Sequence, residues 1–208
     1  MLDKIEIVNP ADIEKRSFEI LSGILGDRAF PKLHEPVIKR VIHTTADFEY
    51  ADILNISPGA VEAGLEAIKS GFNIVTDTKM AAAGINKKKL SSYGGQVACF
   101  MDDENIALDA KQKNVTRASL CMEKASDDPK NGIFVIGNAP TALIRLYELI
   151  AQGLASPFLV IGVPVGFVNV VESKELIKKA GIPFIISEGR KGGSNVAAAI
   201  VNAMLYML

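Results

Sequence analysis

The run Gly132-Ile133-Phe134-Val135-Ile136, which carries no charge, decides the fold of this 208-residue chain. Short runs rich in Val, Ile and Phe, apolar on both faces, are typical of parallel strands that helices cover on both sides. The same pattern recurs at 72–76, 96–100, 157–161 and 183–187. The sequence therefore predicts five strands in one mainly parallel sheet.

Helical patterns alternate with these strands. Between and after the strands we expect helices at Ala142–Gln152, Ser173–Ala180 and Ser194–Leu208. Before the first strand, the capping signals predict three more: one from Asn9 and Pro10 to about Gly26, one following Pro36, and one from Ser57-Pro58-Gly59 to about Gly71. This alternation predicts the α/β class: a five-stranded, mainly parallel sheet with helices on both faces, in a single domain spanning residues 1–208.

Composition excludes several classes of partner. Apolar residues make up 49% and charged residues 23% of the chain, and the net charge is −1, so nothing indicates nucleic acid or an anionic membrane. No apolar run reaches ~18 residues and the first residues lack an apolar signal core, so we expect a cytoplasmic protein. Cys99 and Cys121 are the only cysteines, too few for a disulfide framework, and we expect both to be buried thiols.

Polar clusters follow three of the predicted strands, at residues 76–80, 137–141 and 189–195. In a parallel sheet such clusters gather at the carboxyl edge, where ligands bind. Glycines there bring backbone N–H groups close to a ligand, and a helix N-terminus favours anions. Neither the GxxxxGK[ST] nor the GxGxxG spacing occurs in them, which disfavours a dinucleotide or ATP site.

His43 is the best candidate for proton transfer. The only other histidine is His34, and no cluster of metal-ligand residues accompanies either one, so no metal site is predicted. Arg40 and His43 lie three residues apart on the second helix, away from its apolar face. They belong either to a polar face that contacts only solvent or to a functional site. The helix C-terminus favours the imidazolium form of His43, whereas the charge of Arg40 opposes it.

Ser17 interrupts the apolar spacing of the first helix, which is formed by Ile13, Ile20, Leu21 and Ile24. A serine inside a helix often bonds back to a carbonyl of the preceding turn. The alternative is a hydroxyl that faces a ligand. On spacing alone, the hydrogen bond from the Ser17 hydroxyl to the preceding turn is favoured.

Two blocks, Gly137-Asn138-Ala139-Pro140-Thr141-Ala142-Leu143 and Gly189-Arg190-Lys191-Gly192-Gly193-Ser194-Asn195, are specific enough to compare with known families. Five further blocks accompany them, at residues 16–20, 43–50, 76–85, 116–117 and 162–169. Together and in this order they resemble the precorrin-8X methylmutase / cobalt-precorrin-8 methylmutase family. The resemblance covers nearly the whole chain, with less of the pattern between Ser91 and Asn114.

The resemblance implies an isomerase of cobalamin biosynthesis. Such an enzyme moves a methyl group from C-11 to C-12 of the corrin macrocycle, giving hydrogenobyrinate from precorrin-8X or cobyrinate from cobalt-precorrin-8. By this resemblance His43 is the proton donor and acceptor, and Ser17 and Arg40 bind substrate, which reverses the preference at Ser17. It also implies a homodimer, and no cofactor is expected. From their place on the expected edge we extend substrate contacts to Thr78, Lys79, Arg117, Asn138 and Ser194.

This chemistry is consistent with the residues themselves. A tetrapyrrole rich in carboxylates explains arginines, a lysine and helix N-termini around one cleft, and a methyl shift within the ring needs one acid. Two rival classes remain: a non-catalytic tetrapyrrole carrier, which has no need of His43, and a phosphate- or nucleotide-dependent enzyme that uses residues 189–195. A structural scaffold leaves the three polar clusters unexplained. Nothing in the sequence reports whether the substrate carries cobalt.

Overall fold

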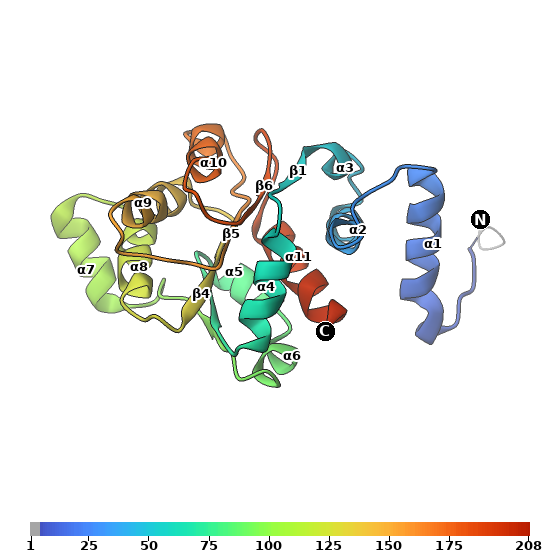
Figure 1. Ribbon diagram of the computed structural model, residues 1–208, viewed down its shortest axis with the longest axis horizontal. Coiled ribbons are helices and arrows are strands. Elements are labelled where there is room, and N and C mark those ends of the chain that lie inside the picture. The colour runs from blue at the N-terminus through green and yellow to red at the C-terminus, as the bar shows by residue number, and fades with distance from the viewer. Residues whose placement is uncertain (1–4) are drawn as a thin grey trace.

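A computed structural model describes residues 5–208 of the chain and places one six-stranded sheet at its centre (Figure 1). The strands are β1 (Leu54–Ile56), β2 (Asn73–Thr76), β3 (Val97–Ala98), β4 (Asn131–Ile136), β5 (Leu159–Gly162) and β6 (Phe184–Ser187). They lie in the order β1-β6-β5-β4-β2-β3, and all neighbours are parallel except β1 and β6. Each of the five strands predicted from the sequence is present, and the α/β class is confirmed.

The prediction of five strands was wrong by one, because β1 adds a sixth strand, antiparallel to β6, and makes the sheet mixed. Its three residues follow the short helix α3 (Tyr50–Ile53) directly, and the next residues start another helix. Its partner β6 lies about 130 residues later in the chain, with Leu54 paired to Ser187. A run this short has no recognisable periodicity of its own, so only the pairing makes it a strand.

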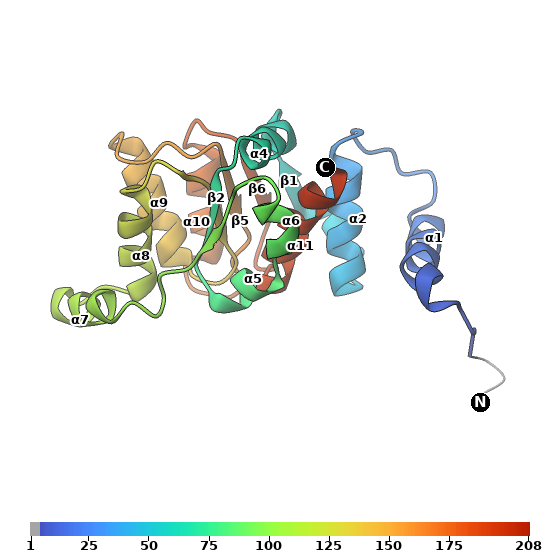
Figure 2. The same cartoon turned by 90° about the horizontal axis from the view of Figure 1, so that it is seen from below.

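Helices cover both faces of the sheet (Figure 2). One face carries α8 (Arg117–Ser126), α9 (Pro140–Ala151) and α10 (Val170–Lys178), with α7 (Glu104–Lys113) outside α8. The other carries α4 (Ala60–Lys69), α11 (Ser194–Met207) and α2 (His34–Thr45). The remaining helices are the 3-10 turn η2 (Pro10–Asp12), α1 (Ile13–Leu25), α5 (Lys79–Gly84) and α6 (Lys87–Ser91).

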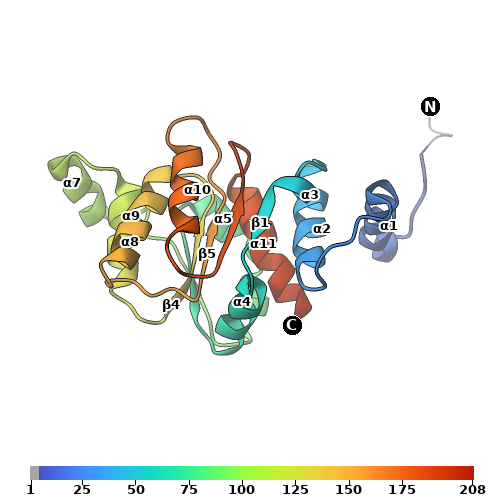
Figure 3. The same ribbon diagram turned by 45° about the horizontal axis from the view of Figure 1, so that its top comes forward.

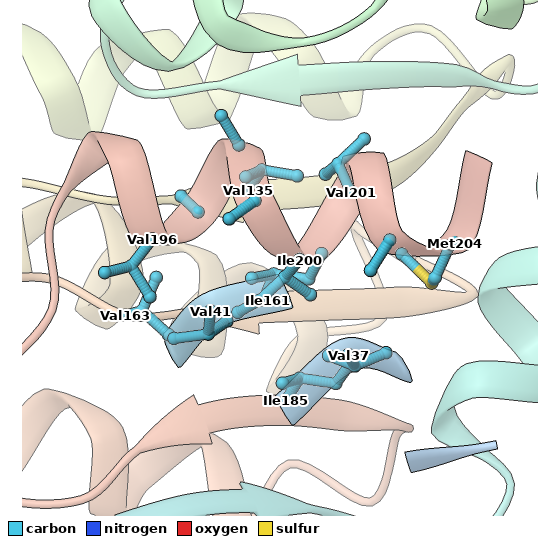
Figure 4. Packing of buried hydrophobic residues seen from close by; sticks show 14 of the residues in the cluster. Val37, Val41, Val135, Ile161, Val163, Ile185, Val196, Ile200, Val201 and Met204 are labelled. Carbon is cyan, nitrogen blue, oxygen red and sulfur yellow. The ribbon is translucent and has the colours of Figure 1, made fainter. Parts of the chain in front are cut away.

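Helix α11 lies between the sheet and α2, and both of its sides are buried. Figure 4 shows Val196 and Ile200 of α11 together with Val41 and Val37 of α2, above strand residues such as Ile185. A helix that is apolar nearly all round is typical of such an interior position. Lys191, just before α11, contacts Asp47, just after α2, so the two helices run antiparallel and the end of α2 lies beside the start of α11.

Helix α1 stands at the edge of the molecule and packs against α2 (Figure 3). Of the apolar positions noted in the sequence only Leu21 is buried, joined by Leu25, whereas Ile13, Ile20 and Ile24 are 54%, 47% and 62% exposed. The helix therefore presents an uncovered apolar face. No helix within residues 5–208 is long and apolar enough to cross a membrane.

Candidate active site

The three polar clusters meet at one edge of the sheet, as predicted, because β2, β4 and β6 run in the same direction. Thr78 caps α5 and its hydroxyl lies 2.7 Å from the hydroxyl of Ser194, at the start of α11. Gly137 lies directly against this serine, since a Cβ at position 137 would be 2.7 Å from the Cα of Ser194. The structure thus brings Thr78, Ser194 and the neighbouring Asn138 together.

The backbone N–H groups of the loop before α9 are not open to a ligand, contrary to what the glycine-rich sequence suggested. The buried carboxylate of Asp77 accepts all three: from Gly137 at 2.8 Å, from Asn138 at 2.8 Å and from Ala139 at 2.7 Å. Burial raises the pKa of Asp77, and the three N–H donors oppose this shift. Asp77 therefore holds the loop in place. The exposed side chain of Asn138 is the polar group of this loop that a substrate could contact.

Cationic side chains lie along the same edge. Lys79 is exposed and forms an ion pair with Asp102. Arg117 is exposed at the first position of α8, and the bond from Thr116 Oγ1 to Thr141 Oγ1, 2.8 Å long, joins the starts of α8 and α9. Within residues 5–208, no carboxylate lies within ion-pair distance of the Arg117 guanidinium. A substrate carboxylate could bind there without displacing a protein partner.

A second group forms where α1 meets α2. The exposed imidazole of His43 stacks on Phe18, with ring centroids 5.0 Å apart. Arg40 lies between two rings, its Cζ 4.8 Å from the centre of Phe18 and 4.9 Å from that of Tyr206, and it also binds the carboxylate of Glu14. Both polar residues of α2 thus contact one ring of α1, which the sequence alone could not show.

Ser17 is half-buried on α1, next to Phe18. Its hydroxyl makes no hydrogen bond to any other residue of the described part, so the hydrogen bond to a carbonyl of the preceding turn is not formed. A cavity of about 390 Å³ opens beside this group and is lined by Phe18, Glu35, Pro36, Lys39, Arg40, Ala203, Tyr206 and Met207. A roomier hollow of about 660 Å³ lies between α8 and α9, but His43 does not line it and its Arg145 is already paired with Glu123 and Glu148.

Lys191 connects the two groups. Its ammonium forms two ion pairs, one with Asp47 and one with Glu49, the latter 2.7 Å long. Both carboxylates lie in the turn that follows the helix of His43. The pair with Lys191 lowers the pKa of Asp47. The loop before α11 is thereby fastened to the end of α2. In contrast, no hydrogen bond or ion pair among the described side chains joins Lys79 or Arg117 to His43.

Sequence reasoning did not predict the roles of four residues that build this region. Asp77 and Lys191 were included only as members of the polar clusters at 76–80 and 189–195, and Phe18 and Lys174 were not candidates. Phe18 lies beside Ser17 in a block that the sequence did single out, but as an ordinary apolar residue. Lys174 is 1% exposed, and burial lowers the pKa of its ammonium to about 8. Nothing in the surrounding helical pattern distinguishes it from the exposed lysines.

The cysteines are on the α7–α8 side of the molecule. Cys121 is buried, which raises the pKa of its thiol to about 11, whereas Cys99 is only half-buried, so the expected burial holds for one of the two. No three His, Cys, Asp or Glu side chains of residues 5–208 are grouped so that they could hold a metal ion.

A mainly parallel sheet whose polar loops gather at one edge, beside an exposed histidine, is the arrangement of an α/β enzyme. The model of the family described as precorrin-8X methylmutase matches residues 12–207, and the chain belongs to this family. It is accordingly an isomerase of the methylmutase type.

Individual relatives agree with the family match. The chain is 46% identical to the cobalt-precorrin-8 methylmutase of Salmonella typhimurium, over 97% of each chain. It is 36% identical to the precorrin-8X methylmutase of Pseudomonas aeruginosa, over 92% of this chain and 93% of the relative. Among solved structures, the precorrin-8X methyl mutase of Thermus thermophilus superposes with a TM-score of 0.86 at 40% identity, covering 94% of this chain and 96% of the other.

Proposed function

We propose that this protein moves the methyl group at C-11 of a corrin precursor to C-12, converting precorrin-8X to hydrogenobyrinate or cobalt-precorrin-8 to cobyrinate. The observation that carries the proposal is the exposed His43, stacked on Phe18 and flanked by Arg40, in a chain of the methylmutase family. Relatives named for the cobalt form are 36–46% identical to this chain, and those named for precorrin-8X are 32–40% identical, so the two ranges overlap but only cobalt-named relatives exceed 40%. This difference makes cobalt-precorrin-8 the first substrate to test.

In the proposed mechanism the imidazolium of His43 protonates a nitrogen of the macrocycle, in ring C. The protonated ring is more electron-poor at C-12, so the methyl group migrates from C-11 to C-12, and the proton then returns to His43. The reaction rearranges bonds within one molecule, so no atom is gained or lost and no external nucleophile is needed.

Substrate binding would come from groups that suit a flat ring with many carboxylates. Arg40 and Arg117 supply guanidinium groups, which bind carboxylates bidentately, and Lys79 supplies an ammonium. Ser17, Thr78, Asn138 and Ser194 supply polar groups near these cations. Arg40 and Lys79 now pair with Glu14 and Asp102, so a substrate carboxylate would replace those partners.

We further propose that two copies of the chain form a homodimer. The support is the uncovered apolar face of α1, where Ile13, Ile20 and Ile24 are about half exposed. Exposed apolar patches of this kind often mark protein–protein contacts. Sedimentation at micromolar protein should give twice the monomer mass of 22.3 kDa, and Ile20→Glu with Ile24→Glu should give the monomer. A wild-type chain that sediments as a monomer would refute this part.

The test of the function is incubation with metal-free and with cobalt-loaded precorrin-8 without oxygen, followed by absorbance. Conversion to the corrin chromophore is expected for one or both forms. A carrier would bind the tetrapyrrole and leave its spectrum in the precursor form, and a nucleotide-dependent enzyme would be stabilised by nucleotides rather than corrinoids in a thermal-shift screen.

A further inference from the structure

The loop from Glu188 to Gly193 surrounds a buried ammonium. Lys174 of α10 donates to Ser187 Oγ at 3.2 Å, to the carbonyl of Gly189 at 2.9 Å and to the carbonyl of Lys191 at 2.9 Å. All three acceptors are neutral, and Lys174 has no carboxylate partner in residues 5–208. An ammonium has three donors, so the geometry uses each of them, and the cation holds the loop from inside.

The two carbonyls that Lys174 holds belong to the residues on either side of Arg190. Ser187 reinforces this arrangement by donating its hydroxyl to the carbonyl of Lys191 at 2.7 Å. The carbonyl of Arg190 itself accepts from Gly166 N at 3.3 Å. The backbone of Arg190 is therefore fixed at three successive residues.

Every other charged side chain of this loop is already engaged. Glu188 bonds to Asn55 and Lys178, both at 2.9 Å, and Lys191 pairs with Asp47 and Glu49. Arg190 differs, since it is exposed and no carboxylate of the described chain lies within ion-pair distance of its guanidinium. The loop thus presents one free guanidinium at the edge where Ser194 and Thr78 meet.

The backbone shape of the loop requires glycine at two positions. Gly192 has φ +156°, and a Cβ at that position would lie 2.1 Å from the carbonyl oxygen of Val163. Gly189 has φ +69°, a left-handed conformation that favours glycine, and its carbonyl is one that Lys174 holds. These constraints and the buried cation leave the loop little freedom.

We propose that Arg190 binds a carboxylate of the tetrapyrrole and that Lys174 is the positioning residue that presents it. The inference rests on the proposed function and adds two residues to its site. Lys174 never touches the substrate; it acts by fixing the carbonyls of Gly189 and Lys191. Arg190 is the group that meets the carboxylate, through its planar pair of N–H donors.

The test is a double-mutant cycle measured as kcat and KM with the tetrapyrrole. Arg190→Ala should raise KM roughly tenfold or more and change kcat little, because a bond to a charged group is lost, and Arg190→Lys should restore part of the loss. Lys174→Met should also raise KM when Arg190 is present. In the Arg190→Ala background, the same substitution should not raise KM any further. Lys130→Ala, which removes an exposed positive charge at the opposite edge of the sheet, is the control and should behave as wild type.

Several outcomes would overturn the inference. A wild-type KM for Arg190→Ala removes Arg190 from the site, and an equal loss from Lys174→Met in both backgrounds shows that Lys174 acts without Arg190. If Lys174→Met does not fold, Ser187→Ala takes its place, because it removes one acceptor of the Lys174 ammonium and the hydroxyl that donates to the carbonyl of Lys191. If Ser187→Ala and Arg190→Ala then raise KM by independent, additive amounts of free energy, the inference is wrong.

The proposed function can fail separately. A wild-type protein that converts neither form of precorrin-8 refutes the function. The role of Arg190 is then decided by absorbance titration with hydrogenobyrinate, in which Arg190→Ala should weaken binding by the same factor and unchanged binding would refute the role.

Discussion

The imidazole of His43 lies nearly parallel to the ring of Phe18, with the two planes 13° apart. The same ring lies 4.8 Å from the Cζ of Arg40. Because Phe18 belongs to α1 and the other two residues to α2, the packing of α1 fixes the orientation of the histidine. A helix at the edge of the molecule therefore contributes directly to the candidate site.

Replacing His43 by Ala should lower kcat by ~10²–10⁴, the usual loss when a proton-transfer group is removed. The side chain is exposed, so the melting temperature and tetrapyrrole binding should change little. Steady-state absorbance kinetics and a binding titration measure both effects. His34→Ala, the other histidine, is the matched control, and a folded His43→Ala protein with the wild-type rate would disprove the mechanism.

Arg40→Ala should weaken substrate binding and raise KM, since a carboxylate partner is lost. Arg40→Lys keeps the charge but loses the planar contact with Phe18 and Tyr206, and each cation–π contact is worth about 0.5–1 kcal/mol at exposed sites. We therefore expect the lysine variant to lie between wild type and Ala. If kcat and KM stay unchanged in Arg40→Ala, this residue does not belong to the site.

Asp77→Asn should destabilise the protein by about 1.5–3 kcal/mol, the range for hydrogen bonds to a charged group. One amide oxygen can accept, but the amide NH2 would face backbone N–H groups that now donate to a carboxylate. Urea unfolding measures the change. The exposed Asp109→Asn serves as the comparison and should leave the unfolding midpoint where it is; an equally small change for Asp77→Asn would contradict the account of the loop.

The free energy of unfolding should rise with pH between about 8 and 10.5 in the wild type, relative to Lys174→Met. Burial lowers the pKa of Lys174 from 10.5 to about 8. Between these values the unfolded chain binds the proton and the folded chain does not, so stability increases as pH rises and the gain is complete above 10.5. Urea unfolding of both proteins across this range gives the difference, and a difference that is flat with pH would mean that the ammonium is not destabilised by burial.

The sequence predicted the parallel strands and the edge where their polar loops meet, because apolar runs such as 132–136 carry that information locally. It did not predict β1, since Leu54–Ile56 becomes a strand only by pairing with β6. It did not predict the role of Asp77 either, because the carboxylate reaches Gly137–Ala139 only when β2 lies next to β4. His43 and Arg40 are neighbours on α2, as the sequence predicts, but the ring of Phe18 that both contact comes from another helix. The roles of the eight predicted site residues remain to be tested.

The bond network of Asp77 has a consequence for selectivity in a cell. Backbone N–H groups at the start of a helix are a common binding place for phosphate, and here the protein's own carboxylate fills that place. To bind at the start of α9, inorganic phosphate or a phosphorylated metabolite would have to displace a buried anion bound by three donors. We therefore expect phosphate at millimolar concentration to leave the start of α9 unoccupied and the loop that carries Asn138 in place.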